Sequence, residues 1–133
     1  MWYLASLVAP LEVPFVVRVA GAVALLVIGQ GIAISGMVAF RRAKTTVNPI
    51  KISTASSLVS GGPFKFTRNP MYLGMLITLA GWAVYLANWL ALLGLPLFVL
   101  YINRFQIAPE ERVMASLFGA DYAAYREKVR RWI

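Results

Sequence analysis

The chain has 133 residues, of which 60% are hydrophobic and only 14% are charged, and its mean hydropathy is +0.72. These polar residues are too few to cover a soluble domain of this size, so we expect an all-α integral membrane protein whose single domain spans residues 1–133. The net charge of +8 arises from basic residues that flank apolar segments. That placement favours contact with anionic lipid and disfavours nucleic-acid binding.

Two residue types are absent and a third is scarce. The chain has no Cys and no His, and no Asp or Glu occurs between Glu12 and Glu110. These absences exclude disulfides, thiol nucleophiles, zinc sites built on imidazole and a His base. We also predict no metal site. Most hydrolytic chemistry is disfavoured for the same reason.

The N-terminal segment, residues 1–12, combines Trp2 and Tyr3 with Pro10. Aromatic residues beside proline suggest an interfacial segment or the remnant of a further helix. No basic region precedes its apolar residues, so we do not interpret it as a cleaved signal peptide.

The first transmembrane helix is predicted over about residues 13–40, where Arg18 is the only charge. Its uncharged part, 19–40, would be about 33 Å long, enough to cross a bilayer once. Gly31 and Ser35 form a small-xxx-small pair that allows close helix contact. Gly29-Gln30-Gly31 does not complete a dinucleotide-binding fingerprint, so helix packing explains it better.

Residues 41–70 are predicted to be a cytosolic loop, because the basic residues gather there and the positive-inside rule then applies. These residues are Arg41, Arg42, Lys44, Lys51, Lys65 and Arg68. The loop is rich in Ser, Thr, Pro and Gly, and its length suggests a functional role.

Residues 71–103 carry no charge, and as one helix they would be about 50 Å long. We therefore predict a hairpin that turns at Asn88, with transmembrane helices over about 71–87 and 89–106. Gly94 and Pro96 are expected to kink the third helix.

The C-terminal segment, residues 107–133, is predicted to form an amphipathic helix pair on the cytosolic membrane surface. Gly119 would cap the first helix and Asp121 would begin the second. The apolar positions are Met114, Leu117, Phe118, Tyr122, Tyr125, Val129 and Trp132.

Two polar clusters stand at the predicted cytosolic ends of the hairpin. Arg68-Asn69-Pro70 precedes the second helix, and Glu110-Glu111 follows the third. Each has a purely structural interpretation: the first as a capped helix with a snorkelling arginine, and the second as acidic residues that favour a helix N-terminus. Two clusters on one side of an apolar hairpin also suggest a ligand site, in which the carboxylates would suit a ligand with a positive centre and hydroxyl groups.

The motif Arg68-Asn69-Pro70-Met71-Tyr72-Leu73-Gly74 resembles the signature of membrane methyltransferases related to isoprenylcysteine carboxyl methyltransferase. Phospholipid N-methyltransferases belong to the same broader group. Glu110-Glu111 followed by Phe118-Gly119-x-x-Tyr122-x-x-Tyr125 and Val129-Arg130-Arg131 resembles the family's closing motif. The resemblance covers about residues 40–133.

This resemblance implies an S-adenosylmethionine site at the cytosolic end of the hairpin, beneath the C-terminal segment. Residues implied to bind or line the donor are Ser57, Leu58, Val59, Phe64, Arg68, Asn69, Pro70, Met71, Tyr72, Gly74, Glu110 and Glu111. Arg104 and Glu111 are implied to be catalytic.

The sequence departs from the family pattern at three places. Asn69 stands where many relatives have His, and it cannot act as a base. Gln106 aligns with an acceptor-facing arginine, for which Arg104 is the nearest substitute. Relatives also have a further N-terminal helix, which residues 1–12 or a partner chain would have to replace.

The predicted function is methyl transfer from S-adenosylmethionine to a lipophilic or lipidated acceptor in a bacterial or archaeal inner membrane, with the site facing the cytosol. Carboxyl O-methylation is favoured, since a carboxylate needs no base. Phospholipid amine N-methylation and a non-catalytic scaffold subunit remain alternatives, and a homo-oligomer is left open. A transporter is disfavoured because no charged residue lies in the middle of the membrane.

Overall fold

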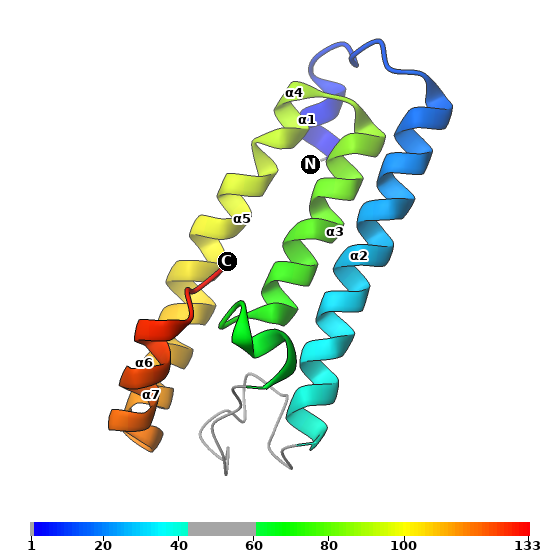
Figure 1. The fold of residues 1–133 in the computed structure, drawn as a ribbon. Coiled ribbons are helices and arrows are strands. Elements are labelled where there is room, and N and C mark those ends of the chain that lie inside the picture. Colours follow the sequence, from blue (N-terminus) through cyan, green and yellow to red (C-terminus); the bar gives the residue numbers. More distant parts are fainter. Residues whose placement is uncertain (1, 43–60) are drawn as a thin grey trace.

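The computed structural model describes residues 2–42 and 61–133, which are mostly helical and contain no strand (Figure 1). The α-helices are α1 (Trp2–Ser6), α2 (Phe15–Arg42), α3 (Pro70–Leu86), α4 (Trp89–Leu92), α5 (Gly94–Ile102), α6 (Ala108–Phe118) and α7 (Ala120–Lys128). A 3-10 turn, η2 (Gly62–Lys65), precedes α3, and a π-helical turn, η3 (Asn103–Ile107), joins α5 to α6.

Among the described residues, two helical runs are long and apolar enough to cross a membrane: α2 and the run from Trp89 to Phe118. Helix α3 has 17 residues and is a shorter apolar helix. The prediction of an all-helical chain is thus confirmed for the described residues, and two of its helical runs are candidate membrane spans. Three membrane-crossing helices remain a prediction, because α3 is only about 26 Å long.

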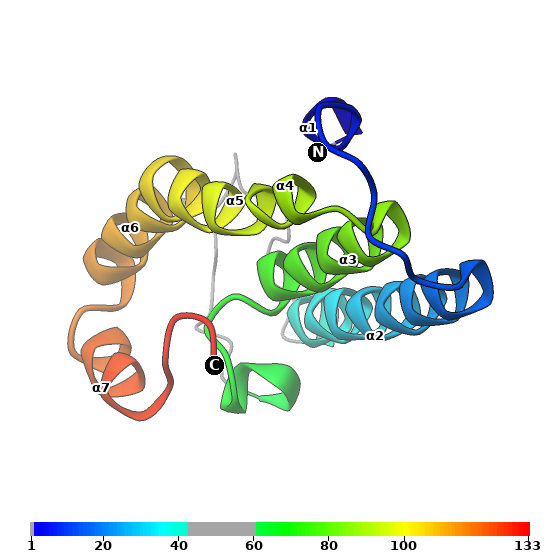
Figure 2. The same ribbon diagram turned by 90° about the horizontal axis from the view of Figure 1, so that it is seen from above.

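Helix α3 lies beside α2 (Figures 1 and 2), and glycines allow the two backbones to approach closely. A Cβ atom on Gly29 would lie 2.6 Å from the Gly74 carbonyl oxygen, and one on Gly36 would lie 2.8 Å from Cγ of Pro70. A Cβ atom on Gly31, by contrast, would have no neighbouring atom within 4 Å. The expectation that Gly31 and Ser35 make the close contact within the chain was therefore wrong.

The hairpin turns at Asn88, as predicted. Ala87 ends α3 in the left-handed region at φ 47°, and Asn88 Oδ1 accepts a hydrogen bond from the backbone N–H of Leu90. Asn88 Nδ2 donates to the carbonyl oxygens of Ala5 and Val8 at 2.9 and 2.7 Å. The buried amide therefore also ties the N-terminal segment to the turn.

The helix after this turn was predicted to end near residue 106, but it continues to Phe118. It is interrupted at Leu93, near Pro96, and again at η3. Pro109 has no N–H to donate to a carbonyl in the preceding turn. The chain widens into a π turn instead, in which the Ala108 N–H donates to the Asn103 carbonyl, and the helix survives.

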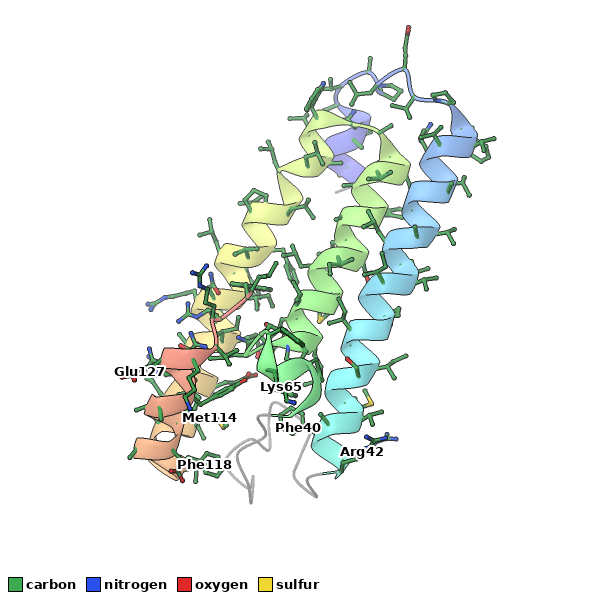
Figure 3. The ribbon with its side chains drawn as sticks, in the orientation of Figure 1. Phe40, Arg42, Lys65, Met114, Phe118 and Glu127 are labelled. Atoms are coloured by element: carbon green, nitrogen blue, oxygen red, sulfur yellow. The ribbon has the colours of Figure 1, made fainter. Side chains whose placement is uncertain are left out.

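The C-terminal segment turns back at Gly119, which ends α6 at φ 52° as predicted. Asp121 lies in the first turn of α7 and is not its N-cap, which is Gly119. The apolar face of α7 packs on η2 rather than lying free for a membrane surface. Phe64, Tyr122, Tyr125 and Val129 form a buried cluster there, with Ala39, Phe40, Met114 and Phe118 around it (Figure 3).

Candidate functional site

Glu111 lies at the centre of an ionic cluster at the end of the hairpin near η2. Both of its oxygens accept hydrogen bonds from Arg131, at 3.0 Å from Nε and 2.7 Å from Nη2. Arg68 Nη1 lies 3.2 Å from Glu111 Oε1, and the Arg68 and Glu111 side chains are only 12% and 13% exposed. The bidentate ion pair of Arg131 with Glu111 is both strong and geometrically specific.

This arrangement leaves some side-chain nitrogen atoms of Arg68 without a hydrogen-bond partner among the described residues. These atoms are Nε and Nη1, and both are buried. The contact of Nη1 with Glu111 has ion-pair distance without hydrogen-bond geometry. Since buried guanidinium N–H groups are costly to leave unpaired, Arg68 is the described residue best suited to bind an acidic group of a ligand.

Glu110 faces a different neighbour, although it lies in the same turn of α6. The Tyr72 hydroxyl donates to Glu110 Oε1 at 2.5 Å, which joins the start of α3 to the start of α6. Consecutive helical residues point about 100° apart. This separation allows one carboxylate to meet α3 while the next meets the C-terminal segment.

The C-terminal segment is bound to the chain just before α3. The Arg68 N–H donates to the Arg130 carbonyl at 3.0 Å, and Asn69 Nδ2 donates to the Arg131 carbonyl at 2.9 Å. Thr67 Oγ1 donates to the same carbonyl at 3.3 Å. The end of the chain therefore closes over the residues that begin α3 (Figure 2).

Asn69 occupies the N-cap position of α3, as predicted, but its side chain makes no capping hydrogen bond. The side-chain amide donates to the Arg131 carbonyl instead. Thr67 Oγ1 accepts from the Asn69 N–H at 3.1 Å, so the threonine, which is 3% exposed, organises the entry to the helix.

Buried tyrosines complete this side of the site. Burial, followed by the charge of Glu111, raises the pKa of Tyr122, and the nearby Arg68 and Arg126 charges oppose that rise. Burial also raises the pKa of Tyr125, whose hydroxyl donates to the Phe64 carbonyl at 2.7 Å. Both phenols are therefore neutral hydrogen-bonding groups at physiological pH.

Several residues expected at the site have other positions. Phe64 lies in the cluster under α7, and Gly74 is buried against the backbone of α2 near Gly29 and Ala33. Pro70 packs against Gly36 of α2, while the adjacent Met71 is half-buried.

Arg104 is exposed on the π turn, and Gln106 is half-buried on the same turn. Within the described ranges, neither side chain forms a hydrogen bond or ion pair with Glu111, Arg68 or Arg131. Ser57, Leu58 and Val59 lie outside the described residues.

Two residues that the structure brings to the site, Thr67 and Arg131, were not expected there from the sequence. Arg131 belongs to the closing motif, but its spacing from Glu111 could not show that the two side chains would meet after the turn at Gly119. In the parts of the chain that the structure describes, no three acidic side chains gather to hold a metal ion.

The described fold is thus a helical membrane protein with a polar, charge-paired site at one end of an apolar hairpin. A family model described as phospholipid methyltransferase matches residues 17–121. The chain belongs to this family, and the resemblance found in the sequence is confirmed.

Individual relatives agree with this membership. An uncharacterized protein of Haemophilus influenzae is 51% identical over 63 residues, which are 47% of this chain and all of that protein. A protein-S-isoprenylcysteine O-methyltransferase of Schizosaccharomyces pombe is 31% identical over 118 residues, 86% of this chain and 49% of that protein. A probable protein-S-isoprenylcysteine O-methyltransferase of Oryza sativa subsp. indica is 32% identical over 108 residues, 79% of this chain and 55% of that protein.

The chain therefore spans about half the length of the relatives named as methyltransferases. No solved structure matches it. Family membership and the two long apolar helices together indicate an integral membrane protein.

Proposed function

We propose that the protein is a membrane methyltransferase that uses S-adenosylmethionine and acts on a lipophilic or lipidated acceptor. The reaction that we favour is carboxyl O-methylation, of the kind named in the relatives. The observation that carries the proposal is the Arg68 side chain, whose buried Nε and Nη1 atoms have no hydrogen-bond partner among the described residues, next to the Glu110–Tyr72 pair at the mouth of the hairpin.

The residues present fit this donor. S-adenosylmethionine carries a carboxylate, an ammonium group and ribose hydroxyls. Arg68 would bind the carboxylate, and Glu110, held by Tyr72, would accept from the ammonium or a hydroxyl group. Asn69 and Met71 would form a wall of the site, Pro70 would support that wall from its packing against α2, and Ser57, Leu58 and Val59 are proposed to complete it.

Glu111 has a different role in this proposal from the one implied by the family motif. Both of its oxygens already bond to Arg131, and Arg68 is close to one of them. Glu111 would therefore position Arg68 and hold the C-terminal segment over the donor, rather than bind the donor directly.

The chemistry suits a chain without His. The bound donor supplies an electrophilic methyl group on a sulfonium, and a carboxylate acceptor needs no proton removed. The protein then has to align the two reactants and exclude water, which the folded-back C-terminal segment would do. Arg104 or Gln106 is proposed to face the acceptor, which would enter from the bilayer.

A second candidate, N-methylation of a phospholipid amine, is favoured by one observation. An amine must lose a proton, and Glu110 is a half-buried carboxylate in hydrogen-bonding contact with Tyr72. The pair could accept that proton where no imidazole is available. The family model, described as phospholipid methyltransferase, points the same way.

Topology follows from the same proposal. Arg41 and Arg42 end α2 at the end of the molecule that holds the site, so the positive-inside rule places that end in the cytosol. With α3, the chain would cross the membrane three times, because a helix of 17 residues is short but still within the length range of membrane-spanning helices. The membrane would be the inner membrane of a bacterium or archaeon.

The test is calorimetric binding of S-adenosylhomocysteine to the full chain in detergent, comparing Arg68→Gln with Lys65→Gln. Lys65 is an exposed basic residue of the same segment. We expect binding by the parent and by Lys65→Gln, and at least a roughly tenfold loss in Arg68→Gln, as for a charge-assisted hydrogen bond.

Absence of binding by a folded parent protein would contradict the enzyme proposal and favour a scaffold subunit. If binding is found, mass analysis of products formed from prenylcysteine and from phosphatidylethanolamine separates carboxyl from amine methylation.

A further inference from the structure

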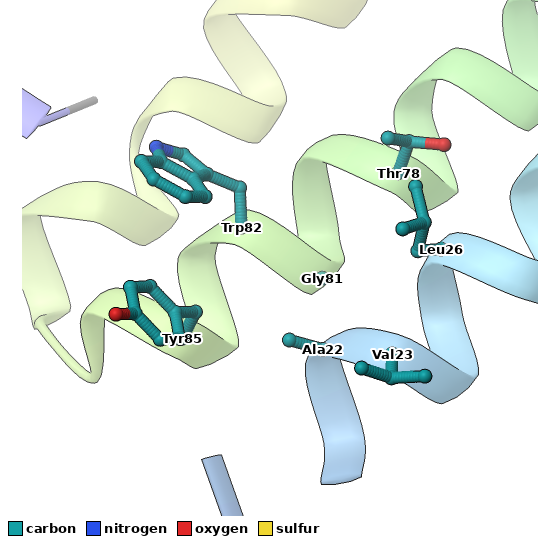
Figure 4. Close-up of a pocket in the computed structure, with 7 residues that line it drawn as sticks. All are labelled: Ala22, Val23, Leu26, Thr78, Gly81, Trp82 and Tyr85. Atoms are coloured by element: carbon teal, nitrogen blue, oxygen red, sulfur yellow. The ribbon is translucent and has the colours of Figure 1, made fainter. Parts of the chain in front are cut away.

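A groove of about 220 Å³ lies between α2 and α3 (Figure 4). Its lining residues are Ala22, Val23 and Leu26 of α2, and Thr78, Gly81, Trp82 and Tyr85 of α3. Gly81 allows α3 to approach the α2 backbone, because a Cβ atom there would lie 3.0 Å from the Ala22 carbonyl oxygen. The groove is lined almost entirely by apolar atoms.

The groove is separate from the candidate methyltransferase site. Tyr85 lies 13 residues after Tyr72, about 20 Å along α3. Tyr72 also points to the other side of the helix, because it is two residues, or about 200°, from Gly74, which faces α2. The groove is smaller than most small-molecule pockets, and this favours part of an extended chain as its occupant.

Arg18 lies at the end of the groove and is held in place. Its Nε donates to the Tyr85 carbonyl at 2.7 Å, and Nη2 donates to the same oxygen. The guanidinium carbon also lies 5.5 Å from the centre of the Tyr85 ring. The exposed Glu12 forms no ion pair with it among the described residues.

Arg18 also lines a second cavity of about 260 Å³, beside Ala5, Ser6, Pro10 and Leu86. Arg18 therefore lines a cavity near the N-terminal segment and also bonds to Tyr85, which lines the apolar groove. Ala22 and Leu26 lie four and eight residues further along α2, about 6 and 12 Å deeper. This is the spacing between a lipid phosphate and the upper part of its acyl chain.

We propose that this region binds one anionic phospholipid, with its phosphate on Arg18 and one acyl chain in the groove. The guanidinium is the described cation nearest the groove, and Arg recognises phosphate well because of its planar set of N–H donors. The stacked Trp82 and Tyr85 rings are amphipathic groups suited to the same interfacial depth. The lipid would stabilise the α2–α3 pair and would not be the methyl acceptor.

The test is native mass spectrometry of the delipidated full chain with equal amounts of phosphatidylglycerol and phosphatidylcholine of matched acyl chains. We expect one retained phosphatidylglycerol, preferred about tenfold over phosphatidylcholine, and loss of that preference in Arg18→Gln. Arg42→Gln, at the opposite end of α2, should keep it. Circular dichroism and thermal unfolding confirm that each variant folds.

A second pair of variants tests the groove while leaving Arg18 in place. Val23 lines the groove, whereas Val27 is 65% exposed on α2 and does not line it. Val23→Trp should lower retention of both lipids several-fold, and Val27→Trp should not. Equal retention by Val23→Trp and Val27→Trp would overturn the proposal and leave only non-specific annular lipid, as would an unchanged preference in folded Arg18→Gln.

Discussion

Two adjacent carboxylates in α6, Glu110 and Glu111, have different neighbours and different roles. Among the described residues, Glu110 accepts a hydrogen bond from Tyr72 alone, whereas Glu111 bonds to Arg131 and lies close to Arg68. Position in the helix explains this difference, since neighbouring residues face different elements. In the proposed site, the first carboxylate would bind the ligand, and the second would hold the C-terminal segment in place around it.

Replacing Glu111 with Gln should destabilise the fold, because two arginines lose their shared carboxylate. Removal of one partner of a buried ion pair costs about 3–5 kcal/mol. Arg131 is 35% exposed and can recover water, so we expect about 2–3 kcal/mol. Reversible denaturation in mild detergent measures the change.

The matched control for this variant is Glu127→Gln, at an exposed position of α7, which should change stability by less than about 0.5 kcal/mol. Equal effects of the two substitutions would contradict the structural role of Glu111.

Packing between the helices α2 and α3 depends on which glycines face the partner helix. Gly29 and Gly36 are buried, and Gly31 is exposed. Small and apolar residues surround α2 on every side, so the sequence does not show which side meets α3. The identity of the contacting glycines therefore required the structure.

Gly29→Ala should destabilise the α2–α3 pair by about 1–3 kcal/mol, because the new Cβ would overlap the Gly74 carbonyl and Thr78 Oγ1, each 2.6 Å away. Gly31→Ala meets no atom within 4 Å, so it should be neutral or stabilise by up to about 1 kcal/mol. Thermal unfolding in detergent compares the two. A larger loss in Gly31→Ala would show that this face also packs against protein.

The helix from Trp89 to Phe118 shows how a local signal can mislead. Pro109 followed by acidic residues is typical of a helix start, and the sequence predicts a separate helix pair over residues 107–133. In the structure the π turn accommodates the proline, and the helix carries Glu110 to Tyr72. The hydrogen bond of the π turn joins the Ala108 N–H to the Asn103 carbonyl, five residues earlier. Helix propensity alone does not indicate such a bond.

Over the molecule as a whole, α7 and the last residues are docked on η2 and the start of α3. Tyr125 is the buried centre of this contact, since its hydroxyl donates to the Phe64 carbonyl across 61 positions of sequence. The site therefore exists only when the C-terminal segment is docked against the folded hairpin.

This docking should make stability fall at alkaline pH. Burial raises the pKa of Tyr125 in the folded state, while the unfolded value is about 10. Because the folded pKa is higher, the stabilisation is complete below pH about 10 and is lost as the pH rises from there toward the folded value. One tyrosine gives a slope of about 1.4 kcal/mol per pH unit.

Denaturation between about pH 9 and 11.5, on either side of the unfolded pKa, tests this expectation. Tyr125→Phe should be less stable at neutral pH, because it lacks the bond to Phe64, but its stability should fall less steeply above pH about 10. Tyr3→Phe, at a 72% exposed position, should retain the parent slope. The same slope in all three proteins would contradict the assignment.

Local sequence patterns were enough to predict the all-helical membrane class, the turn at Asn88, the helix end at Gly119 and the family. Each of these depends on features that a short stretch of chain contains: apolar runs between charges, turn residues and motifs. The same patterns identified Arg68, Tyr72 and the two adjacent glutamates as site candidates.

Which of these candidates contact one another became clear only from the folded chain. Glu110 is paired with Tyr72 and Glu111 with Arg131, Gly74 serves helix packing, and Thr67 joins the site. These outcomes depend on contacts between segments far apart in the sequence and on a helix that continues through Pro109. Local propensity carries no information on either, because both depend on which faces meet when the chain packs.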